Sequence, residues 1–311
     1  MELSNVNKPD LRVKLGDVEL ANPVMLASGT CGYGDELEDY IDLNRLGGIS
    51  VKGTTLEERQ GNPMPRIIET YGGMINAIGF QNVGIERFVS EKYPYLKNIG
   101  ARTFVNITAN SVEEFGLLAA RVDALPEIAG VEVNISCPNI KKGGINMGTD
   151  PFAAAEVVAA VRKATSKHVM VKLTPNVTDI KPIAKACEDS GADSISLINT
   201  LVGMAVDVKT RKPKIANVIG GLSGPAIKPV AVRLTWEVAK TVKIPVVGMG
   251  GISCLEDALE FLIVGASAVQ VGTANFFNPK VTMEIIDGLE KYMLDNGVAK
   301  ISDLVGTLRL D

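Results

Sequence analysis

Short runs of apolar and β-branched residues alternate with longer amphipathic segments along the whole chain. Each run ends in small or polar residues, and nearly continuous apolar runs of this length are typical of parallel strands that are covered on both faces. The sequence therefore predicts eight buried strands, at Val24–Ser28, Gly48–Gly53, Thr103–Thr108, Val131–Ser136, Val169–Thr174, Ser194–Thr200, Pro245–Gly250 and Ala268–Thr273.

The segments between these runs have the apolar spacing of amphipathic helices. Asp or Ser before several of them can cap a helix N-terminus, and glycines such as Gly191, Gly265 and Gly297 can end one. Ile85–Leu96 has a weaker helical pattern, because Pro94 interrupts it. We predict helices at Glu36–Leu46, Val112–Ala124, Pro151–Thr165, Ile180–Ser190, Ile227–Val242, Leu255–Val264 and Val281–Asn296.

Eight strands that are each followed by a helix predict an α/β protein, a single (β/α)₈ TIM barrel. An open, doubly wound sheet is the alternative. Two insertions interrupt the alternation, Thr54–Gln81 after the second strand and Leu201–Gly224 after the sixth, and Leu11–Leu20 reads as an N-terminal hairpin. Because no linker is visible, we expect one domain over residues 1–311.

The composition is that of an ordinary globular protein. Among 311 residues, 46% are hydrophobic and 22% charged, with a formal net charge of −4, which argues against disorder and gives no basic footprint for nucleic acid. The longest uncharged stretch, Phe261–Pro279, is interrupted by glycine and amide residues, so we do not expect it to span a membrane. No signal peptide is visible at the N-terminus, and a cytoplasmic location is expected.

The four cysteines are Cys31, Cys137, Cys187 and Cys254, and no two of them form a C-x-x-C pair. This spacing does not suit a zinc site or an iron–sulfur cluster held by this chain alone. No metal is therefore expected. Cys187 and Cys254 are interpreted as small buried side chains, whereas the role of Cys31, among glycines, stays open.

Lysines and amides stand at the ends of the predicted strands. In a barrel these ends meet at one rim, where active sites lie. Amides suit a planar heterocycle with donors and acceptors, and lysines suit a delocalised anion. The residues are Lys52, Asn106, Asn134, Lys172, Asn199 and Thr200.

Glycines follow the seventh and eighth strands, at Gly248–Gly251 and at Gly272 before Thr273. Barrels often bind phosphate there, because glycine lets backbone N–H groups approach an anion. The other interpretation, that these glycines only make tight turns, carries equal weight. No P-loop and no Rossmann fingerprint is present, so the phosphate would belong to a cofactor or a sugar phosphate.

The only histidine, His168, begins the fifth predicted strand at the far end of the barrel, where a structural role is expected. Proton transfer at the rim therefore needs another base. Cys137 is the leading candidate, because it follows the fourth strand and precedes a glycine-rich, basic loop at 140–148 that can act as a lid.

Ten segments in order along the chain match motifs of one family. They are Ala27–Gly29, Val51–Thr55, Gly61–Arg66, Asn76–Asn82, Asn134–Asn139, Val171–Asn176, Ile198–Thr200, Gly220–Pro229, Gly248–Gly251 and Val271–Asn275. With these segments the chain resembles, over essentially its full length, the class 1 dihydroorotate dehydrogenases, and among them the NAD-linked B type. The ordered set of matches, rather than any one of them, carries the resemblance.

The resemblance implies oxidation of dihydroorotate to orotate in pyrimidine biosynthesis, with FMN as first acceptor and Cys137 as general base. By family position, the FMN contacts would be Ser28, Lys52, Gly53, Asn106, Asn134, Lys172, Ile198, Gly224, Gly250, Gly251, Gly272 and Thr273. The substrate contacts would be Lys52, Asn76, Ala77, Ile78, Gly79, Phe80, Asn134, Asn199 and Thr200.

The B type also implies a partner. In that family a homodimer of the FMN subunit binds two electron-transfer subunits, which carry FAD and a [2Fe–2S] cluster and pass electrons to NAD. The resulting heterotetramer is the expected assembly, with dihydroorotate as the small-molecule substrate and no nucleic-acid or membrane partner.

Four alternatives stay open at this point. One is the fumarate-linked A type, and another is an FMN-dependent dihydrouridine synthase acting on tRNA, which the acidic balance disfavours. A third is a phosphosugar isomerase or aldolase without flavin that uses Lys52 or Lys172. The last, a barrel without catalytic function, is disfavoured by the polar rim.

Overall fold

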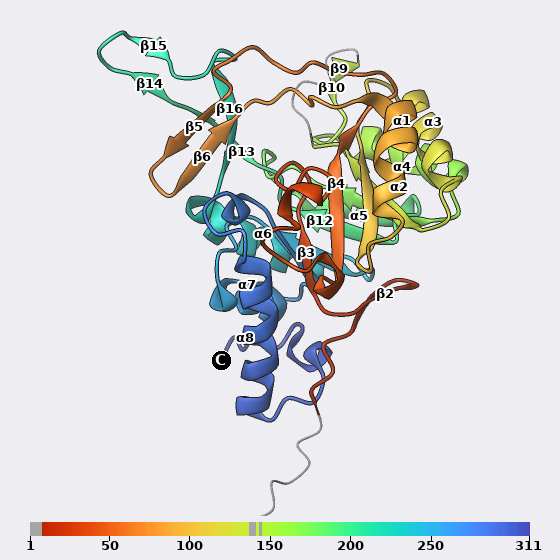
Figure 1. Cartoon of the computed structure of the whole chain (residues 1–311), viewed down its shortest axis with the longest axis vertical. Coiled ribbons are helices and arrows are strands. Elements are labelled where there is room, and N and C mark those ends of the chain that lie inside the picture. Colours follow the sequence, from red (N-terminus) through yellow and green to blue (C-terminus); the bar gives the residue numbers. More distant parts are fainter. Residues whose placement is uncertain (1–7, 137–140, 143–144) are drawn as a thin grey trace, which may run out of the picture.

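The computed structural model describes residues 8–136, 141–142 and 145–311. Eight parallel strands close into a barrel in the order β11-β12-β17-β18-β3-β4-β7-β8, which confirms the TIM barrel and excludes the open sheet (Figure 1). The strands are β3 (Val24–Leu26), β4 (Gly48–Thr54), β7 (Arg102–Ile107), β8 (Ile128–Asn134), β11 (His168–Lys172), β12 (Ser194–Leu197), β17 (Val246–Met249) and β18 (Ala268–Val271).

Helices cover the outside of the barrel. Ser111 caps α3, with its hydroxyl accepting from the backbone N–H of Glu114 at 3.2 Å, and Asp150 caps α4 in the same way. Gly297 ends α8 with a φ of 67°, as predicted. These helices are α3 (Val112–Asp123), α4 (Pro151–Ala164), α5 (Lys181–Asp189), α6 (Lys228–Ala239), α7 (Leu255–Ile263) and α8 (Val281–Asn296). Short 3₁₀ turns come before α6 at η4 (Pro225–Ile227), before α8 at η5 (Thr273–Phe276) and after α8 at η6 (Ile301–Leu304).

The helix predicted at Glu36–Leu46 is wrong. Two 3₁₀ turns stand there instead, η1 (Asp35–Leu37) and η2 (Leu43–Arg45). The Asp42 side chain accepts from the backbone N–H of Asn44, so it begins a new turn and competes with a continuous helix. The helical spacing was misleading because the apolar residues of this segment are buried although they do not lie along a single helix.

Pro94, by contrast, does not end the helical segment around it. The segment runs as α1 (Gly84–Arg87), a wider π-type turn η3 (Phe88–Lys92) and α2 (Tyr93–Leu96). Pro94 stands in the first turn of α2, where a missing backbone N–H does least harm.

The two insertions form one sheet over the barrel. The order of its antiparallel strands is β13-β16-β6-β5. β16 pairs with β6, with Leu222 opposite Ile75, so the insertion after the sixth barrel strand is hydrogen-bonded to the insertion after the second. In Figure 1 these strands gather at the upper left, beyond the barrel, whereas β2 and α8 lie lower. Their bounds are β5 (Ile67–Thr70), β6 (Gly73–Asn76), β13 (Leu201–Met204) and β16 (Ile219–Ser223).

Three small hairpins complete the described part of the chain. The predicted N-terminal hairpin is β1 (Val13–Leu15) with β2 (Val18–Leu20), and β14 (Val206–Asp207) pairs with β15 (Lys212–Pro213). β9 (Lys141–Lys142) pairs with β10 (Ile145–Asn146). No helix of the part that the structure describes is long and apolar enough to cross a lipid bilayer.

His168 lies at the end of the barrel opposite the insertion sheet, as predicted. It is 6% exposed, its Nε2 lies 2.7 Å from the hydroxyl of Ser194, and its ring meets the edge of Phe104. Burial lowers the pKa of His168 to about 4, against a smaller opposing effect of the Asp193 carboxylate. The imidazole is therefore neutral in the folded protein and serves packing.

This buried imidazole predicts a loss of stability in acid. Because the unfolded chain takes up a proton below its pKa of about 6.5 and the folded chain only near 4, stability is present above pH 6.5 and falls as pH falls between the two values. Urea unfolding at pH 7 and pH 4.5 should show a loss about 2–3 kcal/mol larger for the native chain than for His168→Gln. Parallel pH profiles for the two proteins would contradict this.

Candidate active site

A cavity of about 650 Å³ opens at the carboxyl ends of the barrel strands, beneath the insertion sheet. Each barrel strand, or the loop after it, contributes lining residues, and strands β6 and β16 of the insertion sheet contribute others. A cavity of this size and position is where barrel enzymes bind their ligands.

The structure brings the sequence-predicted site residues together. Cys137 is the exception, because it lies outside the described residues, as does part of the predicted lid at 140–148. The predicted residues that line the cavity are Ser28, Lys52, Gly53, Asn76, Ala77, Ile78, Gly79, Phe80, Asn106, Asn134, Lys172, Ile198, Asn199, Thr200, Gly224, Gly250, Gly251, Gly272 and Thr273.

The charges that line the cavity have one sign. Lys52, Arg66 and Lys172 reach it, and no carboxylate stands among its described lining residues. Lys172 is nearly buried, at 4% exposed, so its charge acts through little solvent. The cavity is therefore built for an anion.

Glu132 lies beneath the cavity, fully buried in β8. Its Oε2 accepts from Ser28 (3.1 Å), Ser50 (2.7 Å) and Asn106 (2.6 Å). Burial alone would raise the pKa of Glu132, but the nearby charge of Lys172 and the hydrogen bonds from Ser50, Asn106 and Gln270 hold the pKa below its usual value. The carboxylate is therefore ionised.

The other side of Glu132 is also occupied. Its Oε1 accepts from Ser196 (3.1 Å) and Gln270 (3.0 Å), and Lys172 Nζ lies 3.9 Å from Oε2. Lys172 also donates to the Ser28 hydroxyl at 3.2 Å. The buried charge is compensated by groups from most of the barrel strands.

A row of amides and one hydroxyl runs from Glu132 to the far side of the cavity. Asn134 Nδ2 lies 3.4 Å from Asn106 Oδ1, the Ser136 hydroxyl lies 2.6 Å from Asn134 Oδ1, and Asn199 Nδ2 lies 2.6 Å from Ser136 Oγ. These contacts fix side chains that would otherwise rotate freely, so the cavity presents a preset pattern of donors and acceptors.

The glycine loops approach each other too closely for side chains. A Cβ on Gly251, where φ is 83°, would lie 2.9 Å from the carbonyl oxygen of Gly224 and 2.8 Å from Cβ of Lys228. Glycine is required there both for the backbone conformation and for the space. The result is a concave backbone surface next to Gly272 and Thr273, of the kind that receives phosphate.

Sequence reasoning missed the residues inside the strands. Glu132 and Gln270 were not singled out, although a carboxylate in the middle of the apolar run Val131–Ser136 is a usable signal of a functional buried charge. Gln270 lines the cavity, and its buried Oε1 has no partner among the described residues. This oxygen is a buried acceptor that no described residue satisfies.

The cysteines that are described have structural surroundings. Cys31, left open by the sequence, is buried and donates to the carbonyl of Ala27 at 3.3 Å, and burial raises its pKa to about 12. Burial raises the pKa of Cys187 in the same way. The expectation that Cys254 is buried is wrong, because it is exposed before the first turn of α7.

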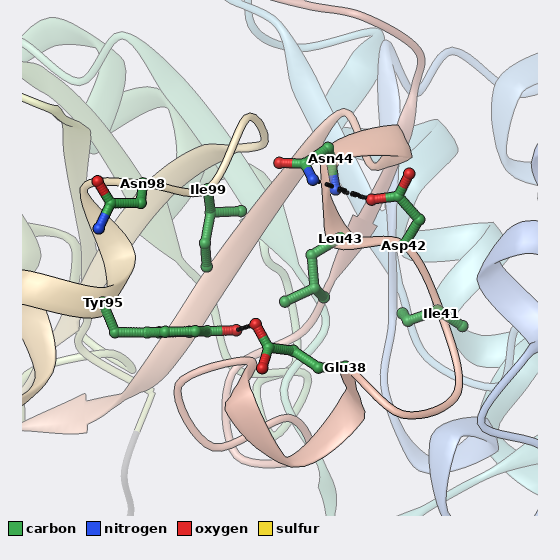
Figure 2. Close-up of a pocket in the computed structure, with 8 residues that line it drawn as sticks. All are labelled: Glu38, Ile41, Asp42, Leu43, Asn44, Tyr95, Asn98 and Ile99. Atoms are coloured by element: carbon green, nitrogen blue, oxygen red, sulfur yellow. Dashed lines mark hydrogen bonds between the residues drawn. The ribbon is translucent and has the colours of Figure 1, made fainter.

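A second, smaller pocket of about 290 Å³ lies between the η1–η2 segment and the end of α2 (Figure 2). Its polar groups already bind each other: the Tyr95 hydroxyl donates to Glu38 at 2.6 Å, and Asn44 Nδ2 donates to Asp42 at 3.0 Å. It shares no lining residue with the large cavity and offers no free cation among the described residues.

Known proteins resemble the chain over most of its length. The family model described as dihydroorotate dehydrogenase matches residues 10–293. A protein of Pelobacter propionicus is 57% identical over 301 residues, which are 97% of this chain and 99% of that protein. One of Geotalea uraniireducens is 56% identical over 303 residues, with the same coverage. Both are named dihydroorotate dehydrogenase B (NAD(+)), catalytic subunit.

A solved structure shares the fold. The crystal structure of DHODH from Eimeria tenella in complex with ferulenol matches with a TM-score of 0.80 over 98% of this chain and 90% of that chain. Its sequence is 22% identical to this chain, so the similarity supports a shared barrel architecture and not a shared ligand.

The close approach at Gly251 predicts a measurable difference between two glycine substitutions. Gly297 has a φ of 67° but nothing within 4 Å of an added Cβ, so Gly297→Ala should lose only the backbone preference, about 1–2 kcal/mol. Gly251→Ala should lose about 1–3 kcal/mol more, because the added carbon overlaps Gly224 and Lys228. Equal losses in urea unfolding would show that the loops are not in close contact.

Proposed function

The chain belongs to the dihydroorotate dehydrogenase family, and on that premise we propose that it is the catalytic subunit of a B-type, NAD-linked enzyme. Its reaction is the oxidation of dihydroorotate to orotate in pyrimidine biosynthesis. The observation that carries the proposal is the cavity at the carboxyl ends of the strands, where cations and amides converge without a lining carboxylate among the described residues. Relatives 55–57% identical over nearly the whole chain favour the B type over the fumarate-linked and tRNA-modifying alternatives.

FMN fits the residues present. The cavity volume suits a flavin nucleotide, the glycine loops suit its phosphate, and the unpartnered Oε1 of Gln270 and the nearly buried Lys172 offer an acceptor and a cation to a polar ring. FMN, when bound, supplies the acceptor for a hydride. The residues proposed to hold it are Ser28, Lys52, Gly53, Asn106, Asn134, Lys172, Ile198, Gly224, Gly250, Gly251, Gly272 and Thr273.

The substrate is proposed to lie under the insertion sheet. Dihydroorotate is an anion with ring N–H and C=O groups, and it suits a wall of amides flanked by Lys52 and Arg66. The residues proposed to contact it are Lys52, Asn76, Ala77, Ile78, Gly79, Phe80, Asn134, Asn199 and Thr200. Arg66, which the sequence did not single out, is a further cation within this cavity.

Cys137 is proposed as the base that takes a proton from dihydroorotate. This assignment rests on the resemblance of Asn134–Asn139 to the family and on the position of the chain's one histidine at the other end of the barrel. A thiol has an ordinary pKa of about 8.5, so a fraction is ionised at neutral pH and lysines nearby would increase that fraction.

The electron acceptor beyond FMN is proposed to be NAD, reached through a partner. The relatives are named catalytic subunits, which implies at least one other subunit. We propose a homodimer that binds two electron-transfer subunits carrying FAD and a [2Fe–2S] cluster. The spacing of the four cysteines does not suit an iron–sulfur cluster held by this chain alone, which supports placing that centre on the partner.

The proposal predicts the visible spectrum of the purified chain. It should carry about one FMN per chain, and anaerobic addition of dihydroorotate should bleach the flavin absorbance because the hydride passes to the ring. Orotate, which has no hydride to give, is the matched control and should shift the spectrum without bleaching it. A colourless protein, or a flavin that dihydroorotate leaves oxidised, would refute the proposal.

Replacement of Cys137 by Ser should separate chemistry from binding. Serine is a far weaker acid, so flavin reduction by dihydroorotate at neutral pH should slow by about 10²–10⁴-fold while FMN stays bound. Cys254→Ser is the matched control, because Cys254 is exposed and lines neither cavity, and it should reduce its flavin at the native rate. A native rate in Cys137→Ser, measured by stopped flow, would remove Cys137 from the mechanism.

Dependence on a partner predicts an acceptor profile. The isolated chain should reduce artificial acceptors with dihydroorotate but not NAD, and should gain NAD reduction when its electron-transfer subunit is added. Efficient NAD reduction by the chain alone is the result that this proposal does not allow. Efficient fumarate reduction would move the chain to the A type.

A further inference from the structure

Glu132 fixes the orientation of the amide next to it. An ionised carboxylate can only accept hydrogen bonds, so Asn106 must turn its Nδ2 toward Glu132, where the distance is 2.6 Å. The Oδ1 of Asn106 is then the acceptor that meets Nδ2 of Asn134 at 3.4 Å. The charge of Glu132 thus sets the orientation of the Asn106 amide.

The orientation of Asn106 in turn fixes the donor and acceptor roles of the next residues in the row. The Oδ1 of Asn134 accepts from both the backbone N–H (3.3 Å) and the hydroxyl (2.6 Å) of Ser136, so Asn134 is fixed at both ends. Since the single hydroxyl hydrogen of Ser136 is used in that bond, its Oγ accepts from Asn199 Nδ2. Among the described residues no donor meets Asn199 Oδ1, which is left as an acceptor for a bound molecule.

Glu132 holds the cation in the same way. Lys172 Nζ donates to the Ser28 hydroxyl at 3.2 Å, and that hydroxyl donates its hydrogen to Glu132 at 3.1 Å. Glu132 is itself fully buried and does not line the cavity, so it acts on a bound molecule only through these neighbours.

We propose that Glu132 is a positioning residue that sets both the donor–acceptor pattern of the amide row and the place of the Lys172 charge. The inference rests on the proposed function, because it assigns the row to orotate and the cation to the flavin. Glu132 does not exchange a proton in the reaction, and its contribution lies in presenting Asn199 and Lys172 correctly before the ligands arrive.

Replacement by the neutral isostere shows what this requires. In Glu132→Gln one of the two terminal atoms becomes an NH₂ group, so donors that now meet the carboxylate face another donor, and Asn106 can turn over. The hydrogen bonds of the row then no longer have one fixed order of donors and acceptors. At the same time the charge of Lys172 is no longer opposed by a buried anion, which favours the reduced, more negative flavin.

The test uses the FMN-loaded chain and two readouts other than turnover. Orotate is titrated against the oxidised protein by flavin absorbance, and the flavin reduction potential is measured by equilibration with a reference dye. Glu132→Gln should raise the orotate dissociation constant at least tenfold and shift the potential to a more positive value. Ser196→Ala is the matched control, because it removes one donor to Glu132 but keeps the charge and the row. Its orotate dissociation constant should stay within threefold of native, and its flavin potential should stay unchanged.

An orotate affinity of Glu132→Gln within threefold of native would overturn the inference. Should that variant fail to fold, Ser136→Ala replaces it, because it breaks the row between Asn134 and Asn199 and leaves the buried charge in place. It should weaken orotate binding at least fivefold with an unchanged potential, and a native affinity would again overturn the inference. Failure of the proposed function is distinct, because the native chain would then hold no flavin that dihydroorotate reduces.

Discussion

The polar interior at the carboxyl end of this barrel depends on one buried carboxylate. Moving an ionised Glu132 out of water costs several kcal/mol unless hydrogen bonds and an opposite charge replace its hydration. Five side chains donate to it, from strands and loops that meet only because the barrel is closed. Strand register matters equally: Glu132 stands beside Asn106 of β7 in the parallel pairing, and Asn134 stands beside Lys172 of β11. The closed barrel therefore brings the donors to Glu132, and those donors stabilise the charge that the barrel buries.

This arrangement separates the charges in a useful way. The anion is buried below the cavity, while Lys172, Lys52 and Arg66 reach the cavity itself. In the proposed complex, a substrate carboxylate thus meets cations and amides and not the buried anion. The insertion sheet closes the other side, and its position depends on the pairing of β16 with β6 across two insertions that are far apart in the sequence.

Much of this could be read from the sequence, for physical reasons. Buried parallel strands have a strong apolar signature, so all eight were found, and a residue at a strand end is placed at the rim once the barrel is assumed, as for Lys52 and Asn199. The interior network could not be read, because Glu132, Ser50 and Gln270 come together only through the closed sheet. The helix predicted at 36–46 was wrong because the Asp42 side chain accepts a backbone hydrogen bond there and begins a separate turn. The role of Cys137 stays a prediction, since it lies outside the described residues.

The central claim, that a buried carboxylate presets this cavity for a flavin and an orotate-like anion, is tested most directly by a crystal structure of the chain with FMN and orotate. We expect the flavin beside Lys172, the orotate carboxylate beside Lys52 or Arg66, and a ring N–H of orotate facing Oδ1 of Asn199. Orotate bound outside this cavity, or a ring carbonyl against Asn199 Oδ1 with the Asn106 amide turned away from Glu132, would contradict the account.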